Sequence, residues 1–164
     1  MKQWFVFYTK SRQEKKIFDF LTKRGYEVFL PLQKVMRQWS DRKKKVEVPL
    51  FNSYLFVHDT EDKIPTILQT PGIAWNIRHN DHPAVLHPRE LDTIQRFLSS
   101  GLFIETGSME TFTQGDAVKI IDGPLKGLIG TVERTAADNK FSVSLESIGH
   151  SIKVTIDPMV LTKA

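Results

Sequence analysis

Few residues in this 164-residue sequence have the types and spacing that catalysis requires. Glu61 and Asp62 are adjacent carboxylates, but consecutive side chains usually point apart, so shared acid–base work is not expected. His79, His82 and His87 would need all three rings or an added carboxylate to hold a metal; the alternative is a polar loop with surface imidazoles. The chain carries no nucleophile-elbow, zinc-protease, Walker or dinucleotide fingerprint. We therefore expect no enzyme activity, no metal and no cofactor.

The composition is that of a soluble globular protein, with 40% apolar and 26% charged residues. The absence of cysteine excludes disulfide scaffolds, thiolate metal sites and cysteine nucleophiles. The sequence has no apolar run of about 18 residues, and its first residues lack the apolar core and cleavage site of a signal peptide. These features predict a cytoplasmic protein that does not enter a membrane.

Basic residues are concentrated in the first part of the chain. Residues 1–48 hold 13 Lys or Arg against 5 Asp or Glu, a net charge of +8. Residues 49–164 hold 10 against 14, a net charge of −4. This asymmetry favours a nucleic-acid partner for the N-terminal part. A solvated basic face is the alternative.

The elements that must position these side chains begin with an aromatic strand at residues 4–9. Ser11 and Glu14 have the spacing of a capping box, which predicts a helix that ends near Gly25. Further strands are expected at 26–30, 34–39, 45–48, 53–58 and 74–78, with a short helix at 62–69 and a helix from Pro88 to Gly101. The order predicts an α+β domain over residues 1–100, with an antiparallel sheet flanked by helices.

The composition changes after this domain. Residues 99–113 are rich in Gly, Ser, Thr and Glu without sustained periodicity, which predicts a linker over residues 101–112. Five β-rich runs separated by turn residues then follow, at 117–121, 128–133, 141–145, 152–156 and 159–162. They predict a second, small all-β barrel over residues 113–164.

The strand at 53–58 is apolar on both faces. Tyr54 and Phe56 share one face, and Leu55 and Val57 share the other. Tyr8, from the first strand, belongs to an equally apolar pattern. Either the helices cover both faces of the sheet, or one aromatic face is left for a partner or for the second domain.

Several of these segments resemble the NusG family of transcription elongation factors. The N-terminal domain is similar to the NusG N-terminal (NGN) domain in its stretches 4–9, 25–31 and 49–57, and residues 115–132 are similar to a KOW domain, an SH3-like barrel. Within that family, the short chain and the stretch Pro-Leu-Phe-Asn-Ser-Tyr-Leu-Phe-Val resemble specialised paralogues of the RfaH and UpxY type more than the housekeeping factor. Asn52 and Ser53 stand where that motif usually has Pro-Gly.

The resemblance implies a non-enzymatic factor that suppresses transcriptional pausing or termination at specific operons. Its N-terminal domain would bind the clamp helices of the largest RNA polymerase subunit through Tyr8, Tyr54 and Phe56. The alternative for these three side chains is burial in the core of the sheet.

The basic residues then divide into two expected nucleic-acid contacts. The helix start would meet non-template DNA through Lys10, Arg12, Gln13 and Lys16. The hairpin at 34–48 would lie along upstream duplex DNA through Arg37, Arg42, Lys43, Lys44 and Lys45. Phosphate contacts of this kind give affinity without sequence information.

The resemblance also implies that the KOW domain binds ribosomal protein S10 or the termination factor Rho, and that the chain is a monomer. The competing interpretation is a ribosome-associated or general RNA-binding KOW protein. Residues 106–164 hold 6 Lys or Arg and 7 Asp or Glu, which disfavours RNA binding by that part.

Overall fold

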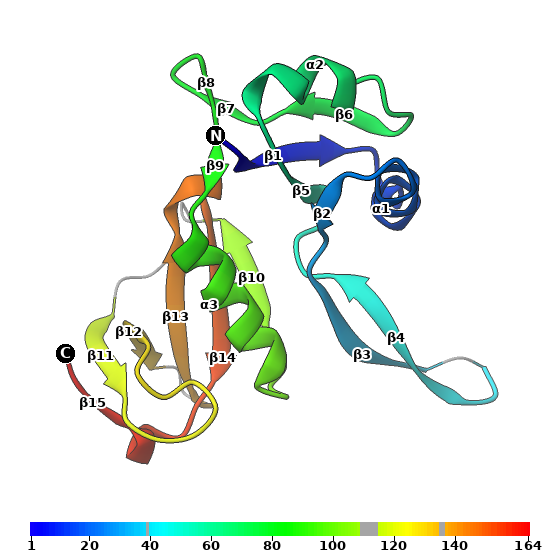
Figure 1. The fold of residues 1–164 in the computed structure, drawn as a ribbon. Helices are drawn as coiled ribbons and strands as arrows, with labels where there is room; N and C mark the ends of the chain where they lie inside the picture. The colour runs from blue at the N-terminus through cyan, green and yellow to red at the C-terminus, as the bar shows by residue number, and fades with distance from the viewer. Residues whose placement is uncertain (39, 109–114, 135–136) are drawn as a thin grey trace. The chain divides into compact units, whose positions relative to one another are not determined.

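A computed structural model describes residues 1–38, 40–108, 115–134 and 137–164 (Figure 1). The chain divides into two compact units, Met1–Leu91 and Asp92–Ala164, which we call the N-terminal and C-terminal units. No helix in the described ranges is long and apolar enough to cross a membrane.

The N-terminal unit is built on an antiparallel sheet in which β2, β5, β1 and β6 are successive neighbours and β9 also pairs with β1. Its strands are β1 (Gln3–Thr9), β2 (Glu27–Phe29), β5 (Tyr54–Asp59), β6 (Ile73–Asn76) and β9 (Val85–Leu86). The helices are α1 (Glu14–Lys23), a 3-10 turn η1 (Glu61–Lys63) and α2 (Ile64–Ile67). Two separate ribbons complete the unit: β3 (Leu32–Gln38) with β4 (Lys43–Pro49), and β7 (Arg78–His79) with β8 (His82–Pro83).

The core of this unit lies between the sheet and the helices α1 and α2. Phe5 and Phe7 of β1 and Leu55 and Val57 of β5 are buried there, together with Ile17, Leu21, Ile64, Ile67 and Ile73. The alternation expected from the sequence is therefore confirmed: these four side chains share one face of the sheet, and Tyr54 and Phe56 belong to the other.

The first helix begins differently from the prediction. α1 starts at Glu14, its N-cap is Gln13, and no side chain caps it. The capping box of Ser11 and Glu14 is therefore wrong, because the Glu14 carboxylate instead accepts a hydrogen bond from the backbone N–H of Ser53, at 3.0 Å. The helix ends as predicted, with Gly25 in the left-handed region at φ +87°.

The C-terminal unit is dominated by a six-stranded antiparallel sheet in which neighbouring strands follow the order β10-β14-β13-β12-β11-β15. The strands are β10 (Glu105–Ser108), β11 (Asp116–Ile120), β12 (Ile129–Arg134), β13 (Asn139–Leu145), β14 (His150–Thr155) and β15 (Leu161–Lys163). The turns η3 (Glu146–Ile148) and η4 (Pro158–Val160) lie between the later strands. The five predicted strands are all present, and β10 is an addition.

The helix α3 (Pro88–Ser99) begins at Pro88, as predicted, and the division between the units falls inside it. Within the C-terminal unit, the Phe97 ring lies 6.3 Å from the Phe141 ring, and Arg96 donates hydrogen bonds to the Lys126 and Pro124 carbonyls. This packing explains why the division comes earlier than residue 100. The predicted domain bounds, 1–100 and 113–164, stay a prediction.

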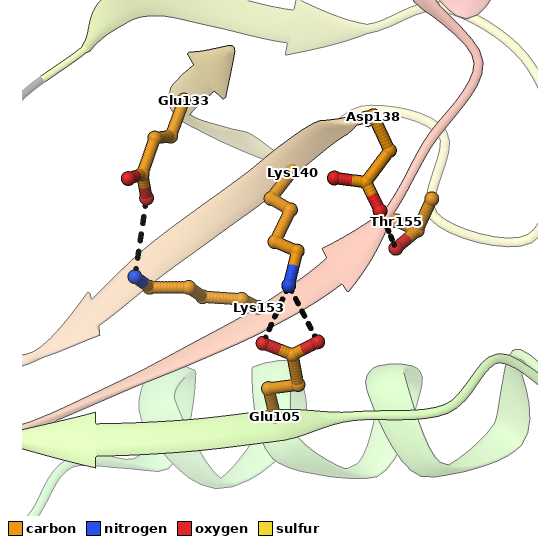
Figure 2. Close-up of polar contacts among 6 residues, drawn as sticks. All are labelled: Glu105, Glu133, Asp138, Lys140, Lys153 and Thr155. Atoms are coloured by element: carbon orange, nitrogen blue, oxygen red, sulfur yellow. Dashed lines mark hydrogen bonds and ion pairs between the residues drawn. The ribbon is translucent and has the colours of Figure 1, made fainter. Parts of the chain in front are cut away.

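Part of the expected linker is a strand, since β10 pairs with β14 from Glu105 to Ser108. Figure 2 shows the ion pair that joins it to a more distant strand: Lys140 of β13 donates to both carboxylate oxygens of Glu105, at 2.6 and 2.8 Å. This hydrogen bond raises the pKa of the Lys140 ammonium. In the same view, Lys153 of β14 reaches Glu133 of β12 at 3.2 Å. Residues 109–112 of the expected linker lie outside the described residues.

Candidate functional site

An exposed aromatic cluster lies at the end of the main sheet. The register pairs Tyr8 of β1 with Tyr54 on one side and with Trp75 on the other. The Tyr8 and Trp75 rings are stacked, with centroids 4.5 Å apart and planes 5° apart, and Tyr54 meets Tyr8 edge-on at 5.7 Å. Trp75 is 53% exposed, whereas Tyr8 and Tyr54 are half-buried. The three rings form one contiguous aromatic surface, and Trp75 is its solvent-exposed part.

The hydroxyl of Tyr54 is in a partly dry environment. Burial raises the pKa of Tyr54, and the neighbouring Tyr8 adds to the rise. The group is therefore neutral at physiological pH and can both donate and accept a hydrogen bond at the edge of an apolar surface. Aromatic side chains with one polar end are the residues most enriched at the centres of protein interfaces.

Phe56, the third residue expected to bind polymerase, does not belong to this surface. Its side chain is fully buried, and its ring lies 5.9 Å from Phe29 and 6.5 Å from Phe51. The alternative that the sequence left open, burial in the sheet, describes its position. Trp75 was missed because its partner Tyr8 is 67 residues away, and only the pairing of β1 with β6 brings the two rings together.

The basic residues at the helix start surround a tight turn. Lys10, Arg12 and Lys16 are exposed and Gln13 is half-buried. Arg12 has φ +63°, a left-handed conformation that costs a non-glycine residue about 1 kcal/mol or more. Strain of this size is kept only where the surrounding structure fixes it, and it is common at binding sites.

A polar recess of about 430 Å³ lies between this turn and the base of the β3–β4 ribbon. Arg12, Lys15 and Arg37 line it together with the carboxylates Glu14 and Glu47. The ammonium of Lys15 donates to the Glu47 carbonyl at 2.7 Å, which ties α1 to β4. The remaining lining residues are Ser11, Val48, Pro49, Asn52 and Ser53.

The departure from Pro-Gly at Asn52-Ser53 has a structural consequence in this recess. Ser53 has φ +68°, the region that favours glycine, so the turn keeps the backbone shape that a glycine would adopt. The buried Glu14 carboxylate holds the Ser53 N–H in place. The recess therefore has a left-handed non-glycine residue on each side.

The β3–β4 ribbon carries the remaining predicted basic residues. Its register sets Arg37 directly opposite Lys44, and it sets Lys43 and Lys45 opposite Gln38 and Met36. Opposite residues of an antiparallel pair point to the same face, so Arg37 and Lys44 lie on one face and Lys43 and Lys45 on the other. Arg42 lies in the turn that joins the strands and is exposed.

The structure thus brings some predicted residues together and leaves others apart. Arg12 and Arg37, which belong to different predicted contacts, line one recess, whereas Lys10, Lys16 and residues 42–45 do not line it. Glu14, Lys15 and Glu47 also line the recess and were not among the predicted residues. No local sequence pattern could have predicted them, because the fold alone brings Glu14 and Lys15 of α1 close to Glu47 of β4. Within the described ranges, no group of three or more His, Asp or Glu residues is placed to hold a metal.

Comparison with known proteins gives this arrangement a family context. A family model described as NusG, transcription termination factor nusG, matches residues 2–95. The transcription termination/antitermination protein NusG of Halalkalibacterium halodurans is 26% identical over 95% of both chains. The protein of the same description from Thermus thermophilus is 26% identical over 99% of this chain and 98% of its own.

A solved structure shows the same fold. A structure titled for domain interaction in Thermotoga maritima NusG superposes with a TM-score of 0.59 at 21% identity, covering 99% of this chain and 97% of that one. The expected α+β N-terminal domain and all-β C-terminal region are confirmed by this match.

Proposed function

The chain belongs to the NusG family of transcription termination and antitermination factors, which are not enzymes, and from that premise we propose that it binds RNA polymerase through the aromatic surface of Tyr8, Tyr54 and Trp75. The observation that carries the proposal is the stacking of Trp75 on Tyr8. The indole of Trp75 is about half exposed and is not part of the buried core. The partner that we propose is the helical hairpin of the polymerase clamp. Exposed aromatic side chains of this kind are the residues that most often anchor protein interfaces.

The outcome of that binding, as we propose it, is suppression of pausing or termination. Anchoring on the clamp would bring the basic helix start and the ribbon to the nucleic acid that leaves the enzyme. Lys10, Arg12, Gln13 and Lys16 would contact the non-template strand, and the adjoining recess is large enough for a single unpaired base. A base held in this way would restrict action to particular operons, as in the specialised RfaH and UpxY paralogues.

The experiment that tests this function is a binding comparison. Fluorescently labelled full-length chain is titrated with core RNA polymerase and, separately, with naked RNA of mixed sequence. We expect saturable binding to polymerase and at least tenfold weaker binding to RNA. Run-through transcription past a terminator is then measured with and without the factor, on templates that differ only in the non-template sequence near the pause site.

The alternative function, a ribosome-associated or general RNA-binding protein, predicts the opposite preference. The C-terminal unit offers it little support, because acidic residues outnumber basic ones from residue 106 onward. We assign that unit to protein contacts instead, with ribosomal protein S10 or Rho as the candidate partners. Tight RNA binding that persists without polymerase would favour the alternative.

A further inference from the structure

The β3–β4 ribbon is separate from the main sheet of the N-terminal unit. It forms its own two-stranded sheet of seven consecutive residue pairs, and it extends beyond the N-terminal sheet in Figure 1. Most of its outer side chains are exposed. An isolated two-stranded hairpin is only marginally stable in water, so a partner that contacts both strands would stabilise it.

The cations of the ribbon occupy both of its faces. Arg37 and Lys44 are directly opposite each other on one face, which places two like charges at the shortest cross-strand distance. Lys43 and Lys45 occupy the other face, one residue pair nearer the turn and one residue pair further from it than Arg37 and Lys44. A ribbon that lies flat on a row of phosphates needs cations on one face only. Cations on both faces fit an anionic site that surrounds the ribbon.

The dimensions identify that site. A two-stranded ribbon with its side chains is about 10 Å thick, and the major groove of B-form DNA is about 12 Å wide and 8.5 Å deep. The three pairs nearest the turn, which carry all four cations, span about 7 Å at roughly 3.4 Å per residue, less than the depth of that groove. A minor groove of about 6 Å is too narrow, and the major groove of A-form RNA is deep and narrow.

We propose that the β3–β4 ribbon inserts turn-first into the major groove of duplex DNA, with Arg37 and Lys44 on the phosphates of one wall and Lys43 and Lys45 on those of the other. This inference rests on the proposed function, in which binding to polymerase brings the ribbon to the nucleic acid. It goes further in naming the groove, the entry direction and the residues for each wall. Arg42, in the turn, then lies nearest the base edges.

Two matched double variants of the full-length chain test the proposal. One is Arg37→Gln with Lys44→Gln, and the other is Lys43→Gln with Lys45→Gln. Binding to a 20-base-pair DNA duplex is measured by anisotropy from 50 to 200 mM salt. We expect each variant to lower the affinity about tenfold at 50 mM salt and to reduce the salt slope by about 2, because each phosphate contact contributes about 0.9. An effect confined to one variant would overturn the proposal, since it would show a ribbon lying on one face.

The control variant is Lys119→Gln with Lys163→Gln, which removes the same charge from exposed positions on the C-terminal sheet. We expect it to leave the slope unchanged; an equal loss would overturn the proposal by showing a non-specific charge effect. Methyl green, which occupies the major groove, should compete with the chain, and distamycin, which occupies the minor groove, should not. Competition by distamycin but not by methyl green would overturn the proposal. So would stronger binding to an RNA duplex than to DNA, or no binding to the DNA duplex at 50 mM salt. None of these measurements includes polymerase, so the proposed function can stand or fail separately.

Discussion

The indole of Trp75 and the phenol ring of Tyr8 lie face to face on neighbouring strands, 4.5 Å apart with planes 5° from parallel. The pair holds the exposed indole in one orientation, so a partner that covers it does not have to order it first. Tyr54 supports the opposite side of Tyr8 edge-on. The stack is therefore a preorganised surface within the N-terminal unit.

Trp75→Ala should weaken binding to RNA polymerase by about 2 kcal/mol, because truncating a central aromatic anchor has an effect of that size. Its thermal stability should change little, since 53% of the side chain is already exposed. Titration of labelled chain with polymerase gives the affinity, and a thermal melt gives the stability. Leu68→Ala, at another exposed apolar position of the same unit, is the control and should bind normally. Equal losses for the two variants would place the polymerase contact elsewhere.

Phe56→Ala should instead destabilise the fold, by about 3–5 kcal/mol, because it removes a fully buried ring from contact with Phe29 and Phe51. Urea unfolding measures this loss, and Phe56→Leu should recover most of it. A Phe56→Ala chain that melts normally but no longer binds polymerase would show that Phe56 acts in the interface after all.

The faces of the main sheet could be predicted from the sequence because alternation in a strand is a local property. Which residues of the aromatic face are buried could not be predicted, because their burial depends on elements that are distant in the chain. The same limit applies to β10, whose Glu-Thr-Gly-Ser sequence has weak strand propensity and which is a strand because it pairs with β14. The capping box failed for a related reason: Glu14 has the right spacing, but a backbone N–H 39 residues away competes for its carboxylate.

His150 should make the C-terminal unit sensitive to acid. Burial lowers the pKa of its imidazole below the ordinary 6.5, and a hydrogen bond with the Gly107 backbone opposes this only in part. The unfolded chain therefore takes up the proton first, and stability present above pH 6.5 is lost as the pH falls through the lowered folded-state pKa. Thermal melts at pH 7.5 and 5.5 should show a larger Tm decrease for the natural chain than for His150→Gln. Parallel decreases would show that other groups cause the acid sensitivity.

Arg12→Gly should separate backbone strain from charge at the recess. Glycine adopts φ +63° without penalty, so we expect the free energy of unfolding to rise by up to about 1 kcal/mol. Affinity for single-stranded DNA should fall about threefold, because one phosphate contact is lost. Ser53→Gly relieves the same kind of strain at φ +68° without a change of charge, so it should be stabilised equally and bind normally. Thermal melts measure the stability of both variants, and anisotropy titrations measure their affinity for DNA. Weaker DNA binding by Ser53→Gly would mean that the backbone shape of the turn, and not the charge of Arg12, determines the affinity.

Lys44→Glu should lower the affinity for DNA and leave the ribbon as stable as before or slightly more stable. Arg37 and Lys44 are opposite each other in the register, so the substitution turns a like-charge pair into an attractive one, worth about 0.2–1 kcal/mol. The Tm should therefore stay level or rise slightly, while duplex affinity falls more than tenfold because the ribbon face that meets one wall of the groove gains a charge that the phosphates repel. Lys44→Gln is the matched comparison, with an intermediate loss of affinity. If the Lys44→Glu chain loses both stability and binding, the Arg37–Lys44 pair supports the fold. Phosphate binding would then no longer be the reason why these two cations lie opposite each other.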